Sequence, residues 1–170
     1  MTAHLPEQHI TVSVLIPARN EASNLQYALP RIPAYVYEVV LIDGHSTDGT
    51  IAEARRLRPD IRIVEQTGWG KGDAIRTGLA KATGDIIVTL DADGSADPVE
   101  ITRFLKPLLN GSDFAKGSRF LKGGGNHDIT RIRRVGNAGL TWLVNLLFSA
   151  RFTGLCYGYN AFWKYCNALS

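Results

Sequence analysis

Apolar residues in this chain gather in short continuous runs separated by polar segments. The strongest runs, at residues 12–16, 38–42 and 86–90, consist largely of Val, Ile and Leu. Continuous apolar runs of this length are typical of strands that are covered on both faces. Weaker runs at residues 61–64 and 113–116 predict two further short strands. The pattern therefore predicts a sheet that is buried on both sides.

Between these runs the apolar positions take the spacing of amphipathic helices. Asn20 is a good N-cap for the first helix, and Pro17 is expected to end the strand before it. The helical stripes lie in the segment after Asn20 and at residues 51–57, 74–82 and 98–108. Four of these strands alternate with helices, which indicates βαβ units with right-handed crossovers. We therefore predict an α/β fold with a mainly parallel, Rossmann-like sheet flanked by helices.

The last quarter of the chain has a different pattern. Residues 132–148 predict a helix whose second part, residues 140–148, is apolar nearly all round. This segment is too short to span a bilayer, so it packs in the core, contacts a partner, or lies on a membrane surface; only its burial distinguishes these roles. Residues 157–163 are too aromatic for a loose tail. We therefore expect residues 1–170 to form one domain that is truncated at its C-terminal end.

Length and composition fit an ordinary globular domain. The chain has 170 residues, of which 45% are hydrophobic and 21% charged, with a net charge of +3. Basic residues crowd between positions 119 and 134, which suits a phosphate-bearing partner or an anionic membrane surface. There is no basic stripe interleaved with aromatic residues, which argues against nucleic acid as a partner. The two cysteines lack metal or redox spacing, so we expect a reducing, cytoplasmic location.

Carboxylates follow two of the predicted central strands. Asp91 and Asp93 come directly after residues 86–90, and Asp43 follows residues 38–42. Ligands of open α/β sheets bind at the carboxyl ends of the strands. Two carboxylates at that place need a counter-charge, and Mg²⁺ or Mn²⁺ typically binds through one or two carboxylates plus substrate phosphates. The sequence therefore predicts a metal site at Asp91 and Asp93, whereas Asp43 has the alternative of capping the next turn.

Basic residues offer two candidate anion sites. Lys71 lies in the glycine-rich stretch of residues 68–72, where a phosphate can approach the backbone closely. The stretch matches neither the P-loop nor the Rossmann fingerprint, and a solvent-exposed turn is its alternative. Arg119, Arg131 and Arg134 form a second candidate cluster, and the alternative for each is an ordinary surface arginine.

Several motifs that occur in one order along the chain resemble a known family. They are Val12-Ser13-Val14-Leu15-Ile16-Pro17-Ala18-Arg19-Asn20-Glu21, Asp43 with Ser46-Thr47-Asp48-Gly49-Thr50, Gly70-Lys71-Gly72, Asp91-Ala92-Asp93 and Gly117-Ser118-Arg119. This order resembles the family 2 glycosyltransferases of GT-A fold. Within that family the chain is most similar to the polyprenyl-phosphate (dolichyl-phosphate) mannosyl- and glucosyltransferases. The resemblance covers about residues 10–165.

The resemblance implies a nucleotide-diphospho-sugar donor, of the GDP-mannose or UDP-glucose type, a divalent metal, and inversion at the anomeric carbon. By position, it places the nucleoside against Pro17, Ala18, Asn20, Glu21 and Asp43, with Lys71 beside it. It also implies that Asp91, Ala92 and Asp93 meet the ribose, the diphosphate and the metal. On the acceptor side it implies that Arg119 and an arginine from Arg131 or Arg134 hold a phosphate.

The chain departs from the family pattern at three places. The stretch Asp43-Gly44-His45 stands where the family often has two consecutive aspartates, so one carboxylate near the nucleoside is absent. Arg19 occupies a position where an aromatic or small residue is common. The later family segment that completes the acceptor side is not found before Ser170. The first departure leaves the identity of a general base open.

The chemistry favours one function over two alternatives. A phosphate acceptor is already largely ionised near neutral pH, because its second pKa is about 6, and it needs no strong base. The leading hypothesis is therefore a metal-dependent hexosyltransferase that acts on a polyprenyl phosphate at the cytosolic membrane face. The alternatives are a soluble glycosyltransferase that uses a carboxylate base on a sugar or small-molecule hydroxyl, and a non-catalytic nucleotide-sugar-binding module.

Overall fold

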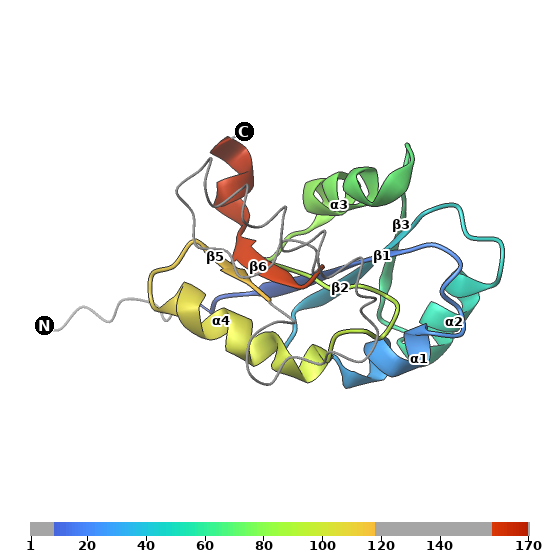
Figure 1. Ribbon diagram of the computed structural model, residues 1–170, viewed down its shortest axis with the longest axis horizontal. Coiled ribbons are helices and arrows are strands. Elements are labelled where there is room, and N and C mark those ends of the chain that lie inside the picture. The colour runs from blue at the N-terminus through green and yellow to red at the C-terminus, as the bar shows by residue number, and fades with distance from the viewer. Residues whose placement is uncertain (1–8, 118–157, 170) are drawn as a thin grey trace, which may run out of the picture.

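The computed structural model describes residues 9–117 and 158–169, which form a six-stranded sheet with helices on both faces (Figure 1). The strand order is β3-β2-β1-β4-β6-β5. The strands are β1 (Val12–Ala18), β2 (Glu38–Asp43), β3 (Arg62–Glu65), β4 (Ile86–Thr89), β5 (Phe114–Lys116) and β6 (Asn160–Trp163). The α-helices are α1 (Leu25–Ala28), α2 (Thr50–Leu57), α3 (Gly70–Lys81) and α4 (Ile101–Leu109). Short 3₁₀ turns are η1 (Leu29–Arg31), η2 (Pro98–Glu100) and η3 (Lys164–Leu169).

The sheet is parallel through its first four strands and antiparallel at one side. β1 pairs with β2 and β4, and β2 pairs with β3, all in parallel. β6 lies antiparallel between β4 and β5. This arrangement confirms the predicted mainly parallel α/β sheet. β6 was not predicted, because its register depends on β4, some seventy positions earlier, and four residues carry too little pattern to define a strand.

Side chains of the central strands are buried alternately on the two faces of the sheet. On one face Val14 and Ile16 of β1 join Leu25, Ala54 and Ile101, which come from α1, α2 and α4. On the other face Leu15 of β1, with Val40, Ile42 and Ile87, packs against Ala74 and Ala82, at α3. Figure 1 shows α3 above the sheet and α1, α2 and α4 below it. Coverage on both sides explains why the strand sequences are apolar without alternation.

Two local predictions at the end of β1 are wrong. Pro17 does not end the strand, since β1 continues to Ala18 in register with Asp43 of β2. Asn20 is not the N-cap of α1, a position held by Asn24. Instead Asn20 has a positive φ of 56° and makes tertiary hydrogen bonds. Asparagine tolerates this left-handed conformation better than most residues, so the same residue type serves a turn rather than a cap.

Helix α3 begins inside the glycine-rich stretch. Gly70, with φ of 83°, starts the helix, so Lys71 lies on its first turn rather than in a loop. At η2, Asp97 accepts a hydrogen bond from the Val99 amide at 3.0 Å, and Pro98 takes the first position, where its missing amide is not needed. None of the helices in the described ranges is long and apolar enough to cross a membrane.

Candidate functional site

A pocket of about 280 Å³ opens at the carboxyl end of the parallel strands, beside the start of α3. It is lined by Pro17, Ala18, Arg19, Glu21, Gly44, Gln66, Gly70, Lys71, Ala74, Asp91, Ala92 and Asp93. Of the residues predicted to bind a donor, the pocket brings together Pro17, Ala18, Glu21, Lys71, Asp91, Ala92 and Asp93. Asn20 and Asp43 do not line it. Segments spread over seventy-seven positions of the sequence thus share one cavity.

Hydrogen bonds between the loops after β1 and β2 shape one wall of this pocket. The Gly44 amide donates to the Ala18 carbonyl at 2.8 Å. The Asn20 amide donates to Ser46 Oγ at 3.0 Å, and Asn20 Oδ1 accepts from the Thr47 amide at 2.8 Å. Asn20 therefore joins the two loops rather than facing the pocket, and its role here is to position its neighbours.

Asp43 is buried at the end of β2 and is only half satisfied. Its side chain is 3% exposed. Oδ2 accepts a hydrogen bond from the Ser46 amide at 3.0 Å, which is the turn-capping role that the sequence left open. Oδ1 is buried and has no hydrogen-bond partner among the residues the structure describes. A buried carboxylate oxygen without a partner is costly to the folded state.

Asp91 and Asp93 lie together in the pocket with different partners. The side chain of Asp91 is 23% exposed and forms an ion pair with Lys71. On its other side Asp91 meets the backbone of Gly158, so closely that a β-carbon on that glycine would collide with the carboxylate. Asp93 is exposed, and its Oδ1 accepts from the Ser95 amide at 2.9 Å. Asp91 is therefore held in place, whereas Asp93 projects from a turn.

Lys71 enters the pocket from the first turn of α3. Gly70 and Ala74, which flank it on the helix, also line the cavity. The amino end of a helix carries a partial positive charge that favours anions, and a lysine on the first turn adds a full one. The start of α3 is therefore a suitable place for a phosphate group.

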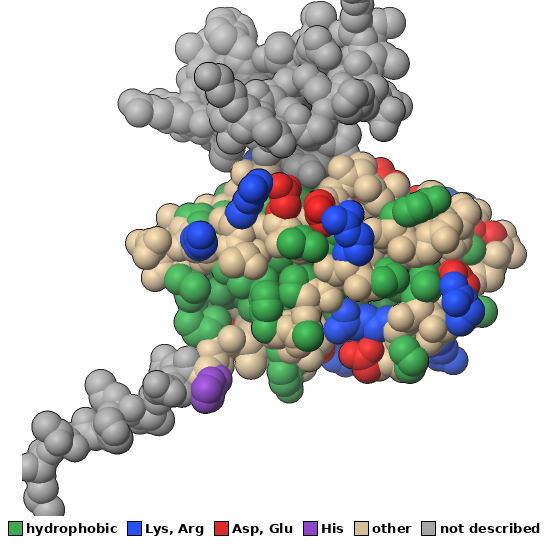
Figure 2. Space-filling model, turned by 90° about the horizontal axis from the view of Figure 1, so that it is seen from below, with side chains coloured by type: hydrophobic (Ala, Val, Ile, Leu, Met, Phe, Trp, Pro, Cys, Tyr) green, Lys and Arg blue, Asp and Glu red, His purple; other side chains and the backbone are tan. Residues whose placement is uncertain are grey.

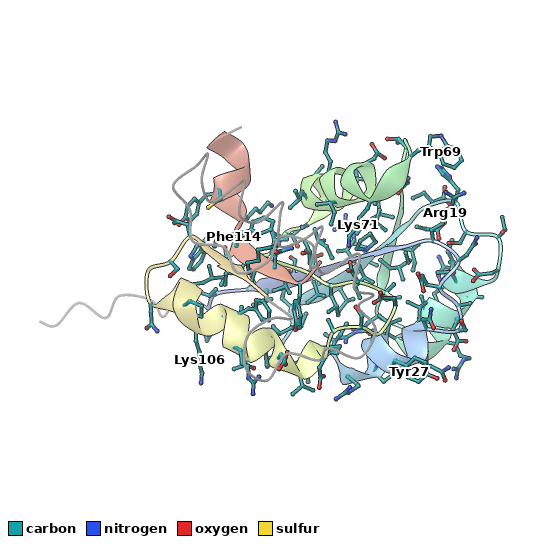
Figure 3. All side chains as sticks on the ribbon, in the orientation of Figure 1. Arg19, Tyr27, Trp69, Lys71, Lys106 and Phe114 are labelled. Carbon is teal, nitrogen blue, oxygen red and sulfur yellow. The ribbon has the colours of Figure 1, made fainter. Side chains whose placement is uncertain are left out.

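An aromatic cluster at the outer rim of the pocket was not predicted. The Arg19 guanidinium lies over the Trp69 ring, 5.3 Å from its centroid. The His45 ring is tilted against the same indole, with 4.8 Å between centroids. Figure 3 shows Arg19 and Trp69 side by side at the end of α3 where the helix begins. The sequence did single out Arg19 and His45, because both stand where the chain departs from the family pattern. Their contact with Trp69 depends on the fold, which brings the three residues together.

The carboxylate oxygens fit a hard divalent cation only in part. Asp91 and Asp93 supply the type of ligand that Mg²⁺ and Mn²⁺ prefer. Within residues 9–117 and 158–169, no three His, Cys, Asp or Glu side chains are placed to hold a metal ion. Two carboxylates would therefore need further oxygen ligands from a phosphate and from water. The donor set suits a metal that binds together with a phosphorylated ligand.

Several predicted residues lie outside the described part of the chain. These are Arg119, Arg131 and Arg134 of the predicted acceptor site, and residues 140–148 of the predicted membrane or partner contact. Their roles stay predictions.

The space-filling view in Figure 2 shows the side of the molecule formed by α1, α2 and α4, where acidic and basic side chains are interspersed.

Comparison with known proteins gives consistent matches. The family model described as "Glycosyl transferase family 2" matches residues 13–166. The chain is 37% identical to a dolichol-phosphate mannosyltransferase of Pyrococcus furiosus over 66% of this chain and 34% of that protein. It is 33% identical to the glycosyltransferase AglJ of Haloferax volcanii over 89% of this chain and 50% of that protein. The chain thus spans about a third to a half of the length of these curated relatives.

Solved structures agree with the fold. The glucosyl-3-phosphoglycerate synthase of Mycobacterium tuberculosis superposes with a TM-score of 0.75 and 25% identity, over 92% of this chain and 58% of that one. A structure of the same synthase in complex with Mn²⁺, UDP-glucose and phosphoglyceric acid matches with a TM-score of 0.71, 25% identity and coverage of 92% and 58%.

Proposed function

The chain belongs to glycosyl transferase family 2, and from this premise we propose that it transfers a hexose from a nucleotide-diphospho-sugar to a polyprenyl phosphate, with inversion. The observation that supports this most is the pocket itself, where Asp91, Asp93 and Lys71 meet at the end of the parallel strands. Opposite charges gathered at that edge suit a diphosphate and its counter-ion. Membership of the family agrees with the resemblance and the enzyme class predicted from the sequence.

The proposed donor site uses residues from four places along the chain: the end of β1, the turn after β2, the first turn of α3 and the turn after β4. The end of β1, with Pro17 and Ala18, and Gly44 after β2 form the wall against which the nucleoside lies. Lys71 donates to phosphate oxygens from the first turn of α3. Asp91 and Asp93 would hold Mg²⁺ or Mn²⁺, a cation that neutralises charge on a leaving diphosphate when it is bound.

The proposed acceptor follows from the relatives and from the chemistry. Two matched relatives at 35–37% identity are named for transfer to dolichol phosphate or undecaprenyl phosphate. A phosphate oxygen is already charged near neutral pH, so the site needs to orient the acceptor in line with the anomeric carbon rather than to deprotonate it. We place the reaction at the cytosolic face of the membrane, and residues 1–170 within a single catalytic domain.

A second acceptor class has support of its own. The structural neighbours include a synthase solved with UDP-glucose and phosphoglyceric acid. A small phosphorylated molecule that is glycosylated on a hydroxyl group is therefore the alternative acceptor. This reaction would need a general base, which a polyprenyl phosphate would not.

A two-part experiment tests the proposal. First, thermal unfolding is followed with GDP-mannose, UDP-glucose and dTDP-glucose, each with and without Mn²⁺. A ligand that binds the native state raises the melting temperature by mass action. Second, transfer of a radiolabelled sugar from the stabilising donor is measured to a short-chain polyprenyl phosphate and to the same polyprenol without its phosphate. We expect metal-dependent stabilisation by one donor and transfer to the phosphate only. Equal melting temperatures with every donor and metal would refute the proposal.

A further inference from the structure

Lys71 and Asp91 form an ion pair inside the pocket. Under the proposed function each of them has a second partner, which is the diphosphate for Lys71 and the metal ion for Asp91. Both line the cavity, and their ion pair is the contact that engages Asp91 from the side of α3. We propose that Lys71 acts as an internal counter-ion, which occupies Asp91 in the donor-free protein and transfers to the donor's diphosphate on binding. This inference rests on the proposed function and adds that metal and donor bind cooperatively because of one lysine.

Lys71 is the partner that is free to move. Its side chain is 54% exposed, against 23% for Asp91. Asp91 is confined by the backbone of Gly158, whose own position is fixed by a hydrogen bond from Thr89 Oγ1 to its carbonyl at 2.8 Å. A lysine has four side-chain torsions and a compact ammonium group that exchanges partners readily. An exchange of the ion pair therefore moves the ammonium group and leaves the carboxylate where it is.

The other charged groups of the pocket do not replace Lys71 at Asp91. The Arg19 guanidinium lies over Trp69, and no ion pair joins it to Asp91 among the described contacts. Asp93 has one oxygen bonded to the amide of its own turn. With Lys71 on Asp91, the pocket holds two cationic and three anionic side chains: Arg19 and Lys71 against Glu21, Asp91 and Asp93. These five side chains sum to a net charge of −1, so the donor-free protein tolerates the three carboxylates in one pocket without a bound metal.

A diphosphate changes this balance in two ways. It brings negative charge next to Asp91 and Asp93, and it draws the ammonium group of Lys71 toward its own oxygens. Asp91 then loses its counter-ion as the local negative charge rises. The same event that engages Lys71 thereby raises the affinity of the two carboxylates for a divalent cation. Because linkage is reciprocal, a cation on the carboxylates must also favour the donor by freeing Lys71.

The test measures Mn²⁺ affinity by calorimetry and by the electron paramagnetic resonance signal of free Mn²⁺, with and without UDP or GDP. Four proteins are compared: wild type, Lys71→Gln, Lys71→Arg and Arg76→Gln. Arg76 lies on the same helix with its side chain 81% exposed and does not line the pocket, so it controls for the loss of one positive charge. Lys71→Arg keeps a cation that is able to pair with Asp91.

Lys71→Gln is expected to raise the Mn²⁺ affinity of the nucleotide-free protein by about 5- to 20-fold, within the usual range of coupling between sites. The same variant is expected to lower nucleotide affinity measured without metal. Lys71→Arg and Arg76→Gln should keep the weak Mn²⁺ binding of the wild type. A lysine that serves only as a phosphate ligand would leave the nucleotide-free Mn²⁺ affinity of Lys71→Gln equal to that of Arg76→Gln, and this result would overturn the inference alone. If none of the four proteins binds Mn²⁺ even with nucleotide, the result contradicts both the inference and the proposed function.

Discussion

Carboxylates lie at both ends of the parallel strands, but the partners of these carboxylates differ between the two ends. At the amino end, Glu38 Oε1 accepts from Ser13 Oγ at 2.6 Å, from the Thr83 amide at 2.5 Å and from Thr83 Oγ1 at 2.9 Å. At the carboxyl end, Asp43 Oδ1 has no partner in the described structure, and Asp91 pairs with a half-exposed lysine. Carboxylates at the amino end thus serve as hydrogen-bond acceptors within the fold, whereas at the carboxyl end one buried oxygen has no partner among the described residues and Asp91 relies on a half-exposed ion pair.

Hydrogen bonding at the amino end also shifts acidity. Burial tends to raise the pKa of Glu38, but hydrogen bonds from Ser13 and Thr83 and the charge of Arg62 outweigh it and hold the pKa below its usual value. Hydrogen bonds from the Thr11 amide and hydroxyl likewise lower the pKa of Asp85. Both residues join neighbouring segments at the point where strands begin. Both carboxylates thus accept hydrogen bonds that join these segments.

The largest expected effect comes from the carboxyl end. A protein with both Asp91→Asn and Asp93→Asn should lose at least about 100-fold in metal-dependent affinity for its sugar nucleotide, because the loss of metal-supporting groups alone costs 10- to 100-fold. Its free energy of unfolding should change by less than about 1 kcal/mol, because the ion pair that is lost involves a half-exposed lysine and contributes little to stability. Calorimetry and urea unfolding measure the two quantities. If the variant retained its sugar-nucleotide affinity and lost much of its stability, Asp91 and Asp93 would serve the fold and not the ligand.

Glu38→Ala is expected to lower stability and to leave donor affinity nearly unchanged, which is the opposite of the double aspartate variant. Removal of this acceptor leaves the donors on Ser13 and Thr83 without a charged partner, so we expect a loss of about 2 kcal/mol in the free energy of unfolding. Donor affinity should stay within about twofold of wild type. Glu65→Ala, which removes an exposed glutamate at the end of β3, is the matched control and should change stability little. If Glu65→Ala destabilises as much as Glu38→Ala, hydrogen bonding is not what distinguishes the two ends.

Gly158→Ala tests how tightly Asp91 is held. A β-carbon there would collide with the Asp91 carboxylate, so Asp91 must shift away from its place beside Lys71. We expect donor affinity with metal to fall by about tenfold, the lower range for disturbed metal-ligand support. Gly111→Ala has open space around its β-carbon and lies outside the pocket, so it controls for a glycine substitution that does not touch Asp91. Equal donor affinity in the two variants would show that Gly158 does not position Asp91.

The smallest expected effect is a pH dependence of stability. Because the pKa of folded Glu38 lies below its unfolded value of 4.5, the stabilisation is fully present above that pH and is lost as the pH falls toward the folded pKa. Asp85 acts in the same direction below 3.8. Melting temperature measured between pH 6 and pH 3 should fall, and Glu38→Gln should make this fall shallower. An unchanged slope in Glu38→Gln would assign the acid sensitivity to other groups.

The sequence predicted the parts of this molecule that depend on local pattern. The continuous apolar runs identified four parallel strands, and the spacing of Asp91 and Asp93 after β4 marked the edge where the pocket lies. The resemblance to the family placed Lys71 beside the donor, whereas its flanking glycines alone left a solvent-exposed turn as the alternative. The end of β1 was wrong, since a proline is tolerated where its missing amide is not needed, and Asn20 took a turn conformation in place of a cap.

What the sequence did not reveal depends on distant segments that meet. β6 follows a long intervening stretch of chain and pairs with β4, which places Gly158 against Asp91. Trp69, Arg19 and His45 come together from three different loops. The structural role of Glu38 depends on Thr83, forty-five positions away. No local pattern in a single sequence encodes such contacts, because each side chain is ordinary in its own segment.

The most direct test of the central claim is a pulsed electron paramagnetic resonance measurement of Mn²⁺ bound to the protein with GDP or UDP. The protein carries ¹³C-labelled aspartate, and couplings of Mn²⁺ to ³¹P and to ¹³C are recorded. We predict both couplings in the wild type, because carboxylates and diphosphate share one ion, and loss of the ¹³C coupling in the variant with Asp91→Asn and Asp93→Asn. A ³¹P coupling without any ¹³C coupling in the wild type would mean that the ion binds the nucleotide and not these aspartates, which would contradict the account.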